Sequence, residues 1–237
     1  MCGVFGIVSA VSVAQADFDR LGELNKARGN LAFGGLVARW ENGRFHPAPF
    51  HHNTPFDSRL VSLHNARLVL SHIRAPTGGQ SNDPTEIHPY ETADLWLAHN
   101  GLLLNHEQFP QWRILPHSSV DSQVIIGGIQ WHLTNGRSLL AAICQTVEQL
   151  EGQQACWLWH KPTQQIYLWR VMSPIYLDQT ATTLLFSSVR PSADATLMPE
   201  GEIWRIDPLN CHIERAATFT FYNPYYIPRK GDNYVHN

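Results

Sequence analysis

Charged side chains are scarce in this chain of 237 residues: they make up 16% of it, against about 25% in an average globular protein. Basic residues number 17 and acidic residues 20, which gives a net charge of −3. The basic residues form no run along the sequence, and binding to nucleic acid without sequence preference needs clustered cations. The composition therefore disfavours a nucleic-acid-binding protein.

Long apolar runs are also missing, because no segment approaches the roughly 20 residues that a membrane-spanning helix requires. Residues 1–16 are apolar, but no basic side chain precedes Arg20, so a buried strand is expected there instead of a secretory signal. The four cysteines form no CxxC pair and are too few for a disulfide scaffold. The sequence therefore predicts a protein of the reducing cytoplasm with no membrane contact.

Metal-binding patterns are absent although the chain has 13 histidines. Neither an HExxH motif nor a paired Cys and His spacing occurs. We expect no metal site.

Hydrophobic residues make up 43% of the chain, which is sufficient for the core of one domain. Strand-like segments precede and follow a helical stretch at 121–150, which is expected to break near Asn135-Gly136, and a short helix is expected at 17–27. Residues 46–58, rich in proline and histidine, are expected to form a loop. This order, without strict alternation of strands and helices, predicts an α+β fold with antiparallel sheets. The predicted strands lie at 4–10, 31–40, 67–73, 94–99, 155–160, 165–170, 173–177, 183–188, 202–206 and 211–214.

Cys2 is a candidate nucleophile because removal of the initiator methionine would leave its thiol beside its own α-amino group. An α-amine has an ordinary pKa of about 7.7–8.0, close enough to neutrality to accept the thiol proton. Nucleophiles at a chain terminus work on this principle. A small buried cysteine without chemistry is the alternative.

Asn100 and Gly101 follow a predicted strand and could stabilise an oxyanion. The asparagine amide and the glycine N–H supply two donors at one strand end, and such donors typically contribute a factor of about 10²–10³ in rate. An ordinary Asn-Gly turn is the alternative.

Arg74 and Asp121 form a candidate pair for recognising an amino acid. Arginine binds a carboxylate through two hydrogen bonds, and aspartate can pair with an ammonium group. A surface salt bridge for Arg74 and a helix cap for Asp121 are the alternatives.

Taken together, the motifs make the chain resemble the glutaminase domain of class-II glutamine amidotransferases, which are N-terminal-nucleophile hydrolases. The resemblance spans about residues 2–207, and Ala75, Leu31, Val120 and Gln123 depart from the usual motifs. It implies a four-layer αββα sandwich, in which two antiparallel sheets lie between helices. The motifs that occur in order are MCGVFGIV, RGN at 28–30, SHIRAPTGG, AHNG followed by Asn105, VDSQ and EGEIWRID.

By this resemblance, Cys2 is the nucleophile that attacks the glutamine side-chain amide, and Asn100 with Gly101 forms the oxyanion hole. Arg28 supports the nucleophile. No cofactor is implied, since the α-amine and these donors supply the chemistry.

The resemblance also implies the substrate contacts. Arg74 holds the α-carboxylate of glutamine or of another γ-glutamyl amide, Thr77 contacts the substrate, and Asp121 binds its α-ammonium group.

Family members usually carry a synthase domain after the glutaminase, and here the chain ends about 30 residues after Ile206. We therefore expect a glutaminase subunit (residues 1–216) that supplies ammonia to a synthase on another chain. A γ-glutamyl amide hydrolase acting alone and a non-catalytic regulatory subunit are the alternatives. The aromatic tail, residues 217–237, is expected to dock on a partner, on a second copy of the chain in a homo-oligomer, or on its own domain.

Overall fold

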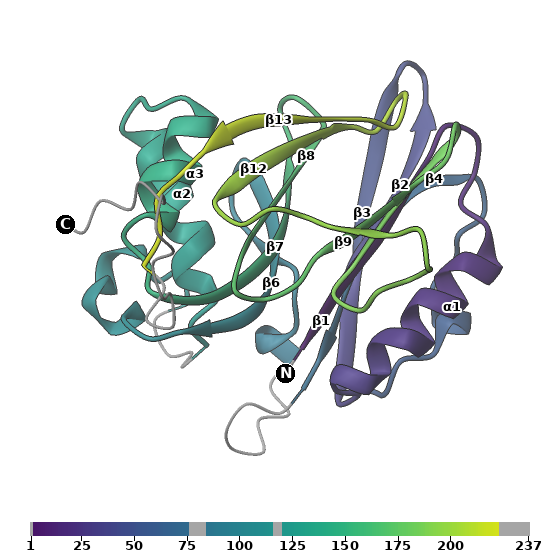
Figure 1. Cartoon of the computed structure of the whole chain (residues 1–237), viewed down its shortest axis with the longest axis horizontal. Helices are drawn as coiled ribbons and strands as arrows, with labels where there is room; N and C mark the ends of the chain where they lie inside the picture. The colour runs from purple at the N-terminus through teal and green to yellow at the C-terminus, as the bar shows by residue number, and fades with distance from the viewer. Residues whose placement is uncertain (1, 76–83, 116–119, 223–237) are drawn as a thin grey trace, which may run out of the picture.

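The computed structural model describes residues 2–75, 84–115 and 120–222. Within them, two antiparallel sheets lie face to face between helices (Figure 1). The first sheet has the order β11 (Thr196–Leu197), β9 (Tyr176–Gln179), β10 (Thr183–Ser187), β1 (Gly3–Ser9), β4 (Ala66–Arg74), β2 (Ala32–Glu41) and β3 (Arg44–His52). The second has the order β13 (His212–Thr218), β12 (Glu202–Asp207), β8 (Gln165–Val171), β7 (Gly152–His160), β6 (Leu95–Leu103) and β5 (Tyr90–Glu91).

Helices cover the outer face of each sheet, which confirms the predicted four-layer αββα sandwich (Figure 1). One side is covered by α1 (Gln15–Asn25), and the other by α2 (Gln123–Thr134) and α3 (Leu139–Val147). The chain breaks between α2 and α3 beside Gly136, as the sequence predicts. Short 3-10 helices add η1 (Lys26–Arg28), η2 (Ser58–Leu60), η3 (Pro84–Glu86), η4 (His106–Gln108) and η5 (Pro110–Trp112).

Apolar side chains fill three interfaces, one between the sheets and one under each helical layer. Between the sheets, Trp157 is fully buried and its indole N–H donates to the Ser71 carbonyl at 3.1 Å, which joins β7 to β4. Phe18 and Leu21, three residues apart on α1, pack on the first sheet. A spacing of three places side chains on one face of a helix, so the short α1 presents a single apolar stripe.

The prediction of a loop at 46–58 is wrong over its first part, because β3 runs from Arg44 to His52. Pro47 and Pro49 lie two residues apart on this strand, which pairs only with β2 in the described sheet. Proline is tolerated on an edge strand, where a missing N–H on the open side removes no bond to a neighbour. Proline content therefore indicated an edge strand here, and not a loop.

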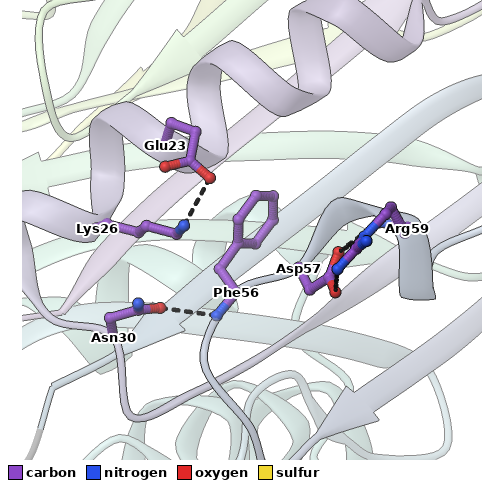
Figure 2. A network of polar contacts seen from close by, with 6 residues as sticks. All are labelled: Glu23, Lys26, Asn30, Phe56, Asp57 and Arg59. Atoms are coloured by element: carbon purple, nitrogen blue, oxygen red, sulfur yellow. Dashed lines mark hydrogen bonds and ion pairs between the residues drawn. The ribbon is translucent and has the colours of Figure 1, made fainter.

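Polar contacts fix the segment after α1 against the loop at 53–60 (Figure 2). The Asn30 side-chain oxygen accepts a hydrogen bond from the Phe56 N–H at 2.7 Å. Lys26 pairs with Glu23 at 2.6 Å, and its ammonium lies 5.9 Å from the centre of the Phe56 ring. These contacts hold η1, and therefore Arg28, at one position beside the start of β1.

The last described residues lie on the domain itself. The boundary expected after residue 216 falls within β13, and Phe219 is buried among the side chains beneath α3. Residues 223–237, which include most of the aromatic tail, lie outside the described residues, so its docking stays a prediction. In the part of the chain that the structure describes, no helix is long and apolar enough to cross a membrane.

Candidate functional site

Cys2 lies directly before β1, a strand that is flanked by β10 and β4 in the first sheet. The partly buried thiol accepts a hydrogen bond from the Ala75 N–H, with 3.4 Å between nitrogen and sulfur. The Arg28 Nε donates to the Cys2 carbonyl oxygen at 2.7 Å. The backbone of Cys2 is therefore held by η1, while its thiol lies at the end of β4.

Gly29 keeps η1 close to this strand end. Its φ angle is 144°, in a region that side chains disfavour, and a Cβ atom there would lie 2.4 Å from the Ala75 Cβ. The Arg28-Gly29 sequence thus brings a guanidinium to Cys2 through a backbone approach that only glycine permits.

Burial raises the pKa of the Cys2 thiol above its ordinary value, and the Ala75 N–H opposes this by stabilising the thiolate. The charge of Arg74 also lowers the pKa of Cys2, whereas the charge of Asp121 raises it. Both charged groups are therefore close enough to Cys2 to act on its thiol.

We expect alkylation of Cys2 by iodoacetamide to be slow at pH 7 in the chain that retains Met1. The thiolate is the reactive form, so the rate should rise with pH through a midpoint above the ordinary cysteine value of about 8.5. Peptide mass spectrometry over a pH series measures this rate. Cys156, which is fully buried, should stay unlabelled in the folded protein. A midpoint for Cys2 at or below the ordinary value would contradict the raised pKa.

Asn100 lies on β6 in the second sheet, yet its side chain is bonded to the first. Its Nδ2 donates to the Ser188 hydroxyl oxygen at 3.1 Å, and the same oxygen accepts from the Val4 N–H at 3.1 Å. The Oδ1 end of the Asn100 amide is buried and has no hydrogen-bond partner among the described residues. If the amide turns over, the Ser188 hydroxyl can donate to Oδ1, and Nδ2 takes the position that has no hydrogen-bond partner among the described residues.

Gly101 is required by the pairing of β6 with β7. A Cβ atom at this position would lie 1.9 Å from the Gln153 carbonyl oxygen and 2.5 Å from the His99 Nε2. His99 is held on both sides, since its Nδ1 contacts the Ser122 hydroxyl at 2.8 Å and its Nε2 contacts the Gln153 carbonyl at 3.0 Å. The backbone at the Asn-Gly step is therefore closely fixed.

Asp121 and Arg74 have partners of their own. The Asp121 carboxylate accepts from the Leu103 N–H at 2.6 Å, which places it beside the end of β6. Arg74 ends β4, and one of its guanidinium nitrogens lies 2.6 Å from the Glu86 carboxylate. The structure thus bonds Arg28 to Cys2, places Arg74 and Asp121 within electrostatic range of the Cys2 thiol, and joins β1 to Asn100 through Ser188. Thr77 lies outside the described residues.

Three residues of this region were not singled out in the sequence: Ser188, Glu86 and Tyr90. Ser188 follows β10 as the second of two serines, a pattern without a specific signal. Glu86 and Tyr90 lie between the predicted strands at 67–73 and 94–99. The partners of Ser188 lie far along the chain, and the ion pair of Glu86 depends on the placement of its side chain, so residue spacing alone could not have indicated these contacts.

Two surface hollows lie away from Cys2. One of about 740 Å³ borders α1 and is lined by residues of the network in Figure 2, including Glu23, Lys26 and Phe56. The other, of about 410 Å³, borders the segment of Glu86 and is lined by Thr85, Ile87 and their neighbours. Neither hollow is lined by Cys2.

Comparisons with known proteins identify the family to which this fold belongs. Glutamine–fructose-6-phosphate aminotransferase (isomerizing) of Aliivibrio fischeri is 30% identical over 169 residues, which cover 64% of this chain and 25% of that enzyme. A glutamine phosphoribosylpyrophosphate amidotransferase structure from B. subtilis, solved with ADP and GMP, has a TM-score of 0.67 at 20% identity and covers 90% of this chain and 49% of that one. This chain belongs to the class-II glutamine amidotransferase domains.

A third comparison gives the same fold. The class-II glutamine aminotransferase domain protein of Silicibacter pomeroyi has a TM-score of 0.59 at 15% identity and covers 92% of this chain and 100% of that one. No family model matches the sequence. The chain spans only about a quarter of the Aliivibrio enzyme, so the amidotransferase domain is what the two proteins share.

Proposed function

We propose that this amidotransferase domain hydrolyses the side-chain amide of glutamine and supplies the ammonia to a synthase. The observation that carries the proposal is the arrangement around Cys2: its thiol is within electrostatic range of Arg74 and Asp121, and the strand that it precedes is bonded through Ser188 to Asn100. The Aliivibrio relative and the B. subtilis amidotransferase, both named as glutamine-dependent, support glutamine as the substrate.

In the proposed reaction, the Cys2 thiol adds to the amide carbon while the α-amine of Cys2 takes its proton. The Asn100 amide and the Gly101 N–H stabilise the oxyanion. The protonated amine then gives its proton to the departing ammonia, and a γ-glutamyl thioester remains. Water hydrolyses this thioester, with the same amine as general base, and glutamate leaves.

The remaining residues would hold the substrate and the nucleophile. We assign the α-carboxylate to Arg74, the α-ammonium to Asp121, and a further contact to Thr77. Arg28 would position Cys2 through its bond to the carbonyl oxygen. The chemistry needs no metal or organic cofactor, and it needs a reduced thiol, so we place the protein in the cytoplasm.

Ammonia release from L-glutamine by the purified protein, with and without a candidate synthase, tests the proposed function. Release that rises with the synthase present supports a subunit that delivers ammonia. Release from other γ-glutamyl amides without any partner would support a hydrolase instead. If neither setting gives ammonia, a regulatory subunit is favoured and the proposal fails.

We expect the active protein to lack Met1, because only then does the thiol have an α-amine on the same residue. Intact mass should be lower than that of the full sequence by one methionine residue. A matched protein with an uncleaved extra residue before Met1 should fold with the same unfolding temperature and release no ammonia. Full activity in that extended protein would contradict the role of the α-amine.

A further inference from the structure

The arginine assigned to the substrate already holds a carboxylate of the chain. Arg74 and Glu86 approach to 2.6 Å, and the two residues are only 9% and 7% exposed. Little water reaches such a pair, so its attraction is weakly screened. Breaking it without a replacement would leave a buried charge uncompensated, which is strongly unfavourable.

An incoming α-carboxylate therefore meets a site whose positive charge is neutralised. Glu86 would repel the substrate carboxylate at short range, and Asp121 adds a second negative charge near Cys2. Like charges brought together in a site of low water content oppose binding. The guanidinium nitrogen that contacts Glu86 is available to a substrate carboxylate only after Glu86 has moved away from it.

Tyr90, directly after Pro89, is a further polar residue of this region. Its hydroxyl is buried and makes no hydrogen bond within the described part of the chain. Burial raises the pKa of Tyr90, and the charge of Glu86 raises it further, while the charge of Arg74 opposes the shift. The phenol thus lies near the Arg74–Glu86 pair and can donate to a carboxylate that approaches it.

We propose that Glu86 is an internal stand-in for the substrate α-carboxylate, and that glutamine binds by displacing it from Arg74. The proposal rests on the function proposed above and adds a residue that sets substrate affinity. In the exchange, Arg74 keeps a carboxylate partner throughout, first Glu86 and then the substrate. Thr85 and Ile87, on either side of Glu86, line the hollow of about 410 Å³, which leaves space beside this segment for a shift.

The variant Glu86→Gln removes the competing charge with little change in shape. We expect it to lower the KM for L-glutamine by about tenfold or more while kcat changes by less than about threefold, since the gain is in binding and not in the chemical step. L-Glutaminamide, labelled with ¹⁵N in its side-chain amide, has no α-carboxylate. Its KM, followed by release of labelled ammonia, should change by less than about threefold.

Glu91→Gln is the matched control, because the Glu91 side chain is 55% exposed and pairs at 2.7 Å with Lys161, which directly follows β7. It should leave the KM of both substrates unchanged. Glu86→Asp keeps the charge on a shorter side chain and should give an intermediate KM for glutamine. An unchanged or raised KM for glutamine in Glu86→Gln, or an equal decrease for both substrates, would overturn the proposal.

Binding of the product separates this proposal from the proposed function. L-Glutamate carries the same α-carboxylate and needs no catalysis to bind. It should raise the unfolding temperature of Glu86→Gln more than that of the wild type, because no carboxylate of the chain competes with it for Arg74 in the variant. If no protein releases ammonia, the proposed function fails, yet this difference still tests Glu86. Equal thermal shifts in the two proteins would refute the stand-in role even in an active enzyme.

Discussion

Replacing Cys2 with alanine is expected to lower the rate of ammonia release from glutamine by a factor of about 10⁴ or more. Without the sulfur no thioester can form, and the donors that remain can only orient water. The loss should appear in kcat, because the substrate contacts assigned to Arg74 and Asp121 are kept. Steady-state kinetics with an ammonia-coupled assay measures the effect.

Cys144→Ala is the control for this experiment. Cys144 is also a partly buried free cysteine, but it lies on α3, where its thiol faces the Thr218 carbonyl oxygen at 3.8 Å. This variant should keep the wild-type rate. A Cys2→Ala protein that retains more than about a hundredth of the activity would show that another group attacks the amide.

Asn100→Asp is expected to have the second largest effect, a loss of about 10²–10³ in kcat or more. The aspartate cannot donate to the oxyanion when ionised, and its negative charge would oppose the one that develops on the substrate. Asn100→Ala removes the donor without adding charge, so it should lose less than Asn100→Asp. The order of the two variants in kcat is therefore the decisive measurement.

Asn210→Asp provides a comparison outside the site. Asn210 is exposed, and its Oδ1 accepts from the His212 N–H at 2.9 Å, a bond that an aspartate keeps. Its rate should equal that of the wild type. Equal rates in Asn100→Ala and wild type, with unchanged unfolding temperatures, would exclude an oxyanion role for Asn100.

The layered fold could be predicted because its signals are local. The apolar runs of β1 and β4 and the apolar stripe of α1 indicate which faces of these elements are buried. β3 was missed because its prolines obscure the strand pattern, although the edge position makes them acceptable. The identity of that edge depends on the order of strands in the sheet, which no local window contains.

The candidate site was only partly predictable. Cys2 and Asn100 belong to motifs whose chemistry can be argued from residue type. Ser188 joins Val4 and Asn100 over separations of 184 and 88 residues, and a serine carries no sign of such partners. Glu86 had no recognisable sequence signal either, because its ion pair with Arg74 depends on the tertiary structure that brings η3 to the end of β4.

The Ser188 hydroxyl, which accepts hydrogen bonds from both Val4 and Asn100, affects how the two sheets move relative to each other. Two sheets that slide against each other on warming would ordinarily change the separation between groups carried by each. Here the Ser188 hydroxyl oxygen is hydrogen-bonded to Val4 on β1 and to Asn100 on β6, so a shift of one strand should move the other with it. The relative position of Cys2 and Asn100 should therefore change less than the thermal motion of each sheet alone would suggest.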